Sequence, residues 1–219
     1  MAYAIVIDPP IPEQMYRTMW EGFGAALRML RLGSFVALLA GSVTASALAS
    51  PKPVDVAIQT NLGTIVVRLD ATHAPNTVKN FLHYVDAGTY NGATFYRTVS
   101  KAREPQSHIE VIQGGLNPQT TNPMIRPIAL EGTDKTGLHN RDGTIAMART
   151  SDPNSATTEF FIDVGDDAFL DAGGPTGPGY AAFGKVIRGM DVVLKIQRAD
   201  ASGETLTPPV KIITVSRLR

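Results

Sequence analysis

The sequence predicts a mainly β domain, a barrel or a sandwich, with two helices attached to it. Short runs rich in β-branched and aromatic residues recur after residue 50, and turns containing Gly or Pro separate them. Two segments, near residues 75–85 and 191–196, have helical periodicity instead. Short strands in this number, without an internal repeat, indicate one all-β core.

The domain begins with a predicted hairpin and a helix. Residues 54–60 and 64–69 are β-branched runs, and Asn61-Leu62-Gly63 forms the turn between them. Pro75 suits the first turn of a helix, where its missing N–H costs nothing. Gly88 is suited to end that helix. One apolar stripe of the helix is predicted to face the core: Val78, Phe81, Leu82 and Val85.

The rest of the domain is predicted to consist mostly of strands. Between the first two of them, residues 100–107 are polar and charged and are predicted to form a surface loop. A second short helix is predicted at residues 191–196. The predicted strands are residues 93–99, 110–113, 144–148, 160–164, 180–186 and 210–215.

The first 49 residues are predicted to be a leader and not part of the fold. Arg28 and Arg31 precede a short apolar stretch at residues 35–40. Two small-residue patterns, Ala45-Ser46-Ala47 and Ala47-Leu48-Ala49, then fit a secretory cleavage site. The apolar stretch is too short for a good membrane span, which needs about 20 residues.

These features predict a signal peptide within residues 1–49 and a mature domain over residues 50–219, located in the periplasm. Translation starting at Met15 or Met29 would give a leader of conventional length. An uncleaved N-terminal anchor and a cytosolic amphipathic helix are the alternatives.

The composition argues against several functional classes. The 20 Lys and Arg residues balance 20 Asp and Glu residues, which gives no electrostatic footprint for nucleic acid or an anionic membrane. Without cysteine the chain has no disulfides, thiol catalysis or zinc–thiolate site. The sequence has no G-x-S-x-G or H-E-x-x-H motif, and residues 173–179 lack the Lys-Ser/Thr of a P-loop. Neither a metal nor a cofactor is predicted.

The remaining candidate for chemistry is Arg97. It follows Phe95 and Tyr96 in a strand pattern, and simple alternation places Phe95 and Arg97 on the same face. From spacing alone, a strand-end surface charge is favoured over a binding group.

A series of motifs in order resembles the cyclophilins over residues 54–215. The match is most similar to the exported bacterial branch, which often has Phe and Tyr where the eukaryotic branch has Trp and His; here these are Phe169 and Tyr180. The matching motifs are Phe95-Tyr96-Arg97, Val111-Ile112-Gln113-Gly114-Gly115, Ile145-Ala146-Met147-Ala148-Arg149, Phe160-Phe161-Ile162, Phe169-Leu170-Asp171 and Ala182-Phe183-Gly184-Lys185-Val186.

The resemblance implies a closed, antiparallel, eight-stranded β-barrel capped by two α-helices, with peptidyl-prolyl cis-trans isomerase activity and no cofactor. It implies that Arg97 is catalytic and that Gln113 hydrogen-bonds the substrate backbone. Ala148 and Arg149 match the strand that pairs with the peptide, and Tyr180 borders the pocket. The residues implied to line a proline pocket are Val111, Phe161, Phe169 and Leu170.

Two departures from the family pattern affect this site. The link between the arginine strand and the Gln-Gly-Gly strand is long, and Glu110 stands where the family usually has a pocket Phe. Either Ile109 or an insertion residue fills that place, or the pocket is open on that side. In addition, Glu159 replaces a common Gln and is a candidate partner for Arg97.

The leading prediction is a periplasmic isomerase that acts on proline-containing, unfolded or nascent exported polypeptides. Such an enzyme needs no nucleophile, because it only has to hold the X–Pro bond better twisted than planar. The alternative is a non-catalytic peptide-binding or chaperone module on the same fold. A hydrolase or metal enzyme is a third and minor possibility. The mature protein is predicted to be a monomer with no stable membrane span and no nucleic-acid partner.

Overall fold

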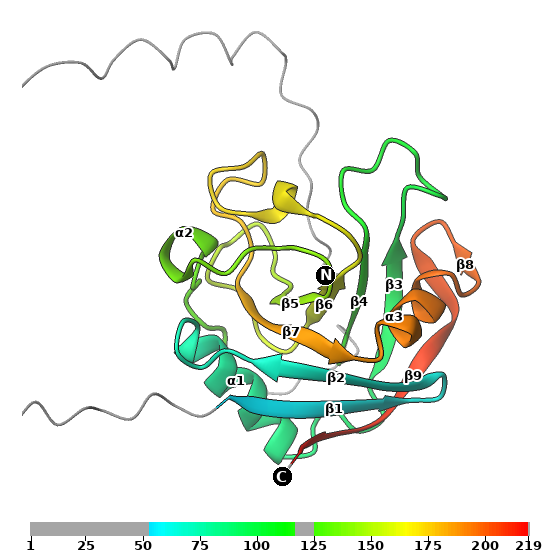
Figure 1. The fold of residues 1–219 in the computed structure, drawn as a ribbon, viewed down its shortest axis with the longest axis horizontal. Helices are drawn as coiled ribbons and strands as arrows, with labels where there is room; N and C mark the ends of the chain where they lie inside the picture. Colours follow the sequence, from blue (N-terminus) through cyan, green and yellow to red (C-terminus); the bar gives the residue numbers. More distant parts are fainter. Residues whose placement is uncertain (1–52, 117–124, 219) are drawn as a thin grey trace, which may run out of the picture. The chain divides into compact units, whose positions relative to one another are not determined.

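The computed structural model describes residues 53–116 and 125–218, so the predicted leader lies outside the described residues. Eight strands form a closed antiparallel barrel in the order β1-β2-β7-β5-β6-β4-β3-β9, and β9 pairs back with β1 (Figure 1). The predicted barrel is thereby confirmed. Its strands are β1 (Val54–Thr60), β2 (Gly63–Leu69), β3 (Thr94–Val99), β4 (Val111–Gly115), β5 (Thr144–Met147), β6 (Phe160–Asp163), β7 (Ala182–Arg188) and β9 (Thr205–Arg217).

The last part of the barrel is longer than the sequence predicted. The strand expected at residues 210–215 is the 13-residue β9, and the two-residue β8 (Ala201–Ser202) pairs with its start. Pro208 and Pro209 lie inside β9. Because proline lacks the N–H that pairs in a sheet, the sequence did not predict a strand over the first half of β9.

Two helices of two or more turns pack on the barrel, as predicted: α1 (Pro75–Asp86) and α3 (Met190–Gln197). Pro75 occupies the first turn of α1, and the Glu131 side chain accepts hydrogen bonds there from the backbone N–H groups of Asn76 and Thr77 at 3.1 and 2.8 Å. A shorter α2 (Thr133–Thr136) and a short 3-10 helix (Ala168–Leu170) lie in the connecting segments.

The interior of the barrel holds the main hydrophobic core. All eight barrel strands and both longer helices contribute buried side chains, including Phe81 of α1, Phe95 of β3, Phe160 of β6 and Val193 of α3. The predicted stripe of α1 is therefore confirmed as a core face. Because strand side chains alternate between the two faces of a sheet, every second residue of β4, β5 and β6 points out of the barrel.

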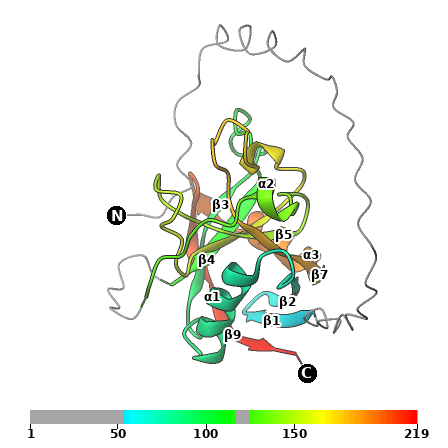
Figure 2. The same ribbon diagram turned by 90° about the vertical axis from the view of Figure 1, so that its left-hand side faces the viewer.

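Two long connections rise at one end of the barrel. Figure 1 shows the loop after β3, in green, and the loop after β6, in yellow, extending toward the same side, and the turned view of Figure 2 agrees. They also touch: the backbone N–H of Glu110 donates to Asp167 Oδ1 at 3.0 Å. Ile109 of the first loop and Leu170 of the second pack with Val111 of β4 and Phe161 of β6, on the outer side of the barrel where the candidate site lies.

Candidate functional site

A β-bulge in β3 decides which way Arg97 points. The register with β4 shifts between Phe95 and Arg97, which leaves Tyr96 as the extra residue. Phe95 pairs with Gly114 and belongs to the core, whereas Arg97 pairs with Gln113 on the outer face. The expectation that Phe95 and Arg97 share a face was therefore wrong, because simple alternation does not survive a bulge.

Strand pairing places four outward-facing side chains in one row across β3, β4, β6 and β5. Arg97 is paired with Gln113, Gln113 with Phe161, and Phe161 with Ala146. Directly paired residues point to the same face, and neighbouring strands lie about 4.8 Å apart. The row, called here the outer row, therefore sets a guanidinium, an amide and an aromatic ring side by side.

Two side chains hold the Arg97 guanidinium in this row. Its Nε donates to Glu204 Oε2 at 2.6 Å, and its Nη1 donates to Gln113 Oε1 at 2.9 Å. The Arg97 side chain is only 10% exposed, and the Glu204 side chain is 35% exposed. Arg97 is thus a fixed, nearly buried cation and not the strand-end surface charge that spacing alone favoured.

A second apolar cluster, called here the slot cluster, lies beside the outer row. Phe161 contacts the Tyr180 ring edge to face, with ring centroids 5.6 Å apart. Phe169 is half-buried against the cluster. The buried members of the cluster are Val99, Ile109, Val111, Ala146, Ala148, Phe161, Leu170 and Tyr180. The structure therefore brings all four predicted pocket-lining residues together, next to Arg97 and Gln113.

The loop between β3 and β4 completes the slot cluster. Ile109 is fully buried in the cluster, and His108 stacks on Phe169 with ring centroids 4.9 Å apart. Glu110 instead pairs with Lys101 at 3.7 Å. Of the alternatives left open by the sequence, Ile109 filling the place of the missing Phe is the one observed.

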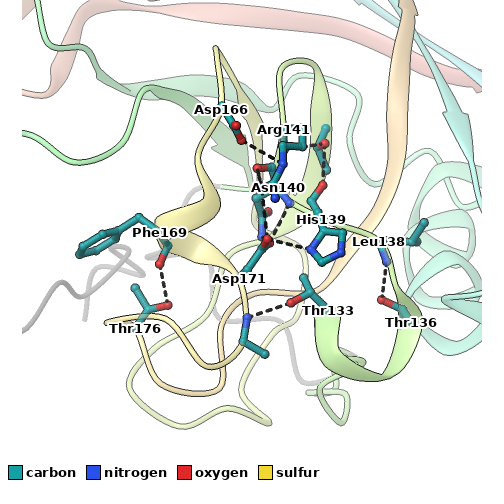
Figure 3. A network of polar contacts seen from close by, with 12 residues as sticks. Thr133, Thr136, Leu138, His139, Asn140, Arg141, Asp166, Phe169, Asp171 and Thr176 are labelled. Atoms are coloured by element: carbon teal, nitrogen blue, oxygen red, sulfur yellow. Dashed lines mark hydrogen bonds and ion pairs between the residues drawn. The ribbon is translucent and has the colours of Figure 1, made fainter. Parts of the chain in front are cut away.

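The turn that carries Phe169 and Leu170 is anchored by the carboxylate of Asp171 (Figure 3). Asp171 accepts hydrogen bonds from His139 Nδ1 at 2.8 Å, from the Asn140 backbone and side chain at 2.8 and 2.9 Å, and from Arg141 Nη1 at 3.1 Å. Burial opposes ionisation, but the hydrogen bonds from Asn140 and His139 outweigh it and lower the pKa of Asp171. In Figure 3 the Phe169 ring points away from this network.

The remaining predicted site residues follow β5. The backbone N–H of Ala148 donates to the carbonyl of Glu159 at 2.9 Å, and Ala148 itself faces the slot cluster. The Arg149 guanidinium lies over the Tyr180 ring at 4.5 Å, and its Nε donates to the Gly179 carbonyl at 3.0 Å. Arg149 thus stiffens the wall formed by Tyr180.

The comparisons with known proteins agree with this geometry. The family model described as "Cyclophilin type peptidyl-prolyl cis-trans isomerase/CLD" matches residues 55–217. The chain belongs to the cyclophilin family. The prediction that the protein is a peptidyl-prolyl cis-trans isomerase is confirmed.

Curated relatives place this cyclophilin among isomerases of similar length. It is 40% identical over 185 residues to the "Peptidyl-prolyl cis-trans isomerase" of Acinetobacter baylyi, which covers 82% of this chain and 93% of that protein. It is also 40% identical over 172 residues to "Peptidyl-prolyl cis-trans isomerase A" of Dickeya dadantii, with coverage of 76% and 83%.

A solved structure shares the fold. A cyclophilin type peptidyl-prolyl cis-trans isomerase from Cryptosporidium parvum superposes with a TM-score of 0.63 at 22% identity, covering 77% of this chain and 99% of that one. A second structure of the Cryptosporidium protein, determined in the presence of the dipeptide Ala-Pro, has a TM-score of 0.61 at 23% identity.

Glu159 does not have the partner that the sequence suggested for this cyclophilin. Its carboxylate accepts from the Tyr96 hydroxyl at 2.6 Å, whereas the ion pair of Arg97 is with Glu204. Sequence reasoning missed Glu204 as a site residue, because it lies more than 100 positions after Arg97 in the β8–β9 turn. Its spacing gave no signal that could have found it.

The described residues hold no group of three or more His, Asp or Glu side chains placed to bind a metal ion. Within the same ranges, no helix has the length and apolar character needed to cross a membrane.

Proposed function

We propose that this cyclophilin accelerates the rotation of X–Pro bonds in exported polypeptides in the periplasm, by holding the twisted bond between Arg97 and the slot cluster. The observation that carries the proposal is the nearly buried guanidinium, oriented by Glu204 and Gln113, with only strand β4 between it and Phe161.

The barrier to be lowered is that of a partly double C–N bond, about 18–20 kcal/mol. Cis and trans forms of an X–Pro bond differ by only about 0.5–1 kcal/mol, so the reaction is an exchange of near-equal states that is slow without help. Twisting the bond localises the nitrogen lone pair and shifts charge in the carbonyl. A site that stabilises this distribution more than the planar one catalyses the rotation.

The residues divide this task by their chemistry. In this proposal the proline ring packs against the apolar slot cluster, in which Phe169 is partly buried and Phe161 fully buried. The guanidinium of Arg97 is permanently charged and presents its donors in a rigid plane. Because Glu204 and Gln113 fix that plane, little reorganisation is needed when charge shifts in the twisted amide.

The non-catalytic alternative rested on Glu110 and on the long loop before it. Ile109 fills the cluster and Glu110 points to Lys101, which removes the reason to expect a broken slot. The deciding experiment is a protease-free isomerase assay of the full chain on a proline peptide. Acceleration supports the proposal; peptide binding without acceleration supports the chaperone module and refutes it.

The cellular part of the proposal has its own test. Residues 28–49 carry the basic, apolar and small-residue features of a signal peptide. N-terminal sequencing of the protein from a periplasmic extract is expected to start near Leu48 or Ser50. Recovery in the cytosol with an intact N-terminus would contradict export.

A further inference from the structure

A chain of hydrogen bonds runs from Arg97 through Gln113 and Tyr96 to Glu159. Arg97 Nη1 donates to Gln113 Oε1 at 2.9 Å. Gln113 Nε2 donates to the Tyr96 hydroxyl oxygen at 2.8 Å, and that hydroxyl donates to Glu159 Oε2 at 2.6 Å. Tyr96 reaches this position because it is the extra residue of the β3 bulge.

Elementary chemistry fixes the direction of every bond in the hydrogen-bond chain while Glu159 is ionised. A guanidinium has donors and no acceptor, so the oxygen of the Gln113 amide must face Arg97 and its nitrogen must face Tyr96. The Tyr96 oxygen receives that N–H, and its own proton goes to Glu159. Glu159 is therefore the terminal acceptor of a chain that begins at the proposed catalytic arginine.

The Glu159 carboxyl sits in a closely fitted place. The residue is 2% exposed, and a Cβ added at Gly115 of β4 would lie 2.7 Å from the carboxyl atoms. The titratable groups that face it are the Tyr96 phenol from β3 and the Tyr90 phenol from the segment before β3, and the Thr158 hydroxyl is hydrogen-bonded to it. Gly115 adds no side chain from β4.

We propose that Glu159 is a positioning residue for the Arg97–Gln113 pair, acting through the Tyr96 hydroxyl, and that loss of its proton raises the isomerase activity. This inference rests on the proposed function. A carboxylate can only accept hydrogen bonds, so it keeps the Tyr96 O–H pointing toward Glu159. The Tyr96 oxygen then stays free to accept from Gln113, and each bond toward Arg97 becomes stronger. A protonated carboxyl can instead donate to the Tyr96 oxygen and compete there with Gln113.

The transition falls in an accessible pH range. Burial raises the pKa of the Glu159 carboxyl to about 8, although hydrogen bonds from Tyr96 and Thr158 act to lower it. The hydrogen bonds from Arg97 to Glu159 are thus expected to become stronger between neutral and mildly alkaline pH.

The test compares pH profiles of kcat/KM from pH 6.5 to 9.5 in a protease-free assay with the full-length protein. The unmodified enzyme should gain roughly three-fold across pH 8, the order of effect when one bond of a coupled chain becomes charge-assisted. Glu159→Gln keeps an acceptor oxygen but cannot titrate, and Tyr96→Phe cuts the link. Both variants should lose the rise, and Asp191→Asn on α3 should keep it.

His108 also lies against the slot cluster, stacked on Phe169, and it is unchanged in all four proteins. A merely structural role for Glu159 would lower activity equally at every pH. An unchanged rise in Glu159→Gln would overturn the inference.

A second readout needs no activity. The side-chain amide resonances of Gln113 should shift with pH near 8 in the unmodified protein and stay constant in Tyr96→Phe. Constant resonances in the unmodified protein would also overturn the inference. If the protein proved inactive at every pH, the isomerase proposal would fail, and the amide titration would still report on the chain.

Discussion

Replacing Asp171 by alanine should loosen the turn that carries Phe169 and Leu170. The Asp171 carboxylate accepts four hydrogen bonds, two of them from the backbone and side chain of the fully buried Asn140 (Figure 3). Leaving a buried donor without its acceptor costs about 1–3 kcal/mol each. Asp171→Ala leaves two such donors without their acceptor, and water that enters the site offsets part of the cost. The free energy of unfolding should therefore fall by about 3 kcal/mol. For a domain of this size that lowers the Tm by about 6–12 °C.

The assay is urea denaturation followed by fluorescence or circular dichroism, together with kcat and KM on a proline peptide. Because the turn carries two walls of the slot cluster, KM should rise along with the loss of stability. Asp166→Asn is the matched control: Asp166 pairs with Arg141 Nε at 3.0 Å, but its side chain is 71% exposed. An exposed pair of this kind contributes at most about 1 kcal/mol. If Asp171→Ala were no less stable than Asp166→Asn, the anchoring argument would be refuted.

Three further predictions concern Ile109, Asp163 and Glu204. Ile109→Ala should cost about 2–5 kcal/mol in urea denaturation and raise KM, because it opens a cavity in the slot cluster; an unchanged KM would mean that Ile109 is not part of the binding surface. Burial raises the pKa of Asp163 well above its usual value and that of Asp167 to about 7. In the pH range between the unfolded and folded pKa values of these two groups the folded state binds more protons, so their contribution to stability is full below about pH 4 and is lost as the pH rises through 7. Asp163→Asn should flatten this fall and raise stability at pH 8 by about 1–3 kcal/mol; a steeper fall would reverse the sign of the argument. Glu204→Ala should lower kcat/KM about five-fold without changing the fold, because Arg97 keeps its hydrogen bond to Gln113 but loses its ion pair. Isomerase assays of this variant at two salt concentrations check the prediction. Activity equal to that of the unmodified enzyme would show that Glu204 does not orient Arg97.

The sequence predicted well what depends on local pattern. The first hairpin, the core stripe of α1 and most barrel strands follow from β-branched runs, turn residues and helical spacing. The eight-stranded closure and the grouping of Phe161, Phe169 and Tyr180 came from the resemblance to the cyclophilins and not from spacing.

Three features could not be predicted because they depend on tertiary structure. The bulge at Tyr96 moves Arg97 to the outer face, and nothing in Phe95-Tyr96-Arg97 announces an extra residue. Glu204 meets Arg97 only because β8 and β9 return beside β3. Glu159 faces Tyr96 and not Arg97, which again depends on the direction set by the bulge.

The most direct test of the central claim is kcat/KM for Arg97→Ala in the full-length protein. Arg68→Ala is the control, because it removes an arginine from an exposed ion pair. Arg68 is half-exposed and paired with Asp55 at 2.8 Å. If Arg97 stabilises the twisted bond, Arg97→Ala should lose roughly 100-fold or more in kcat/KM while its circular dichroism stays native. Arg68→Ala should stay within about two-fold, since exposed ion pairs contribute little. A folded Arg97→Ala protein with undiminished kcat/KM would contradict the account.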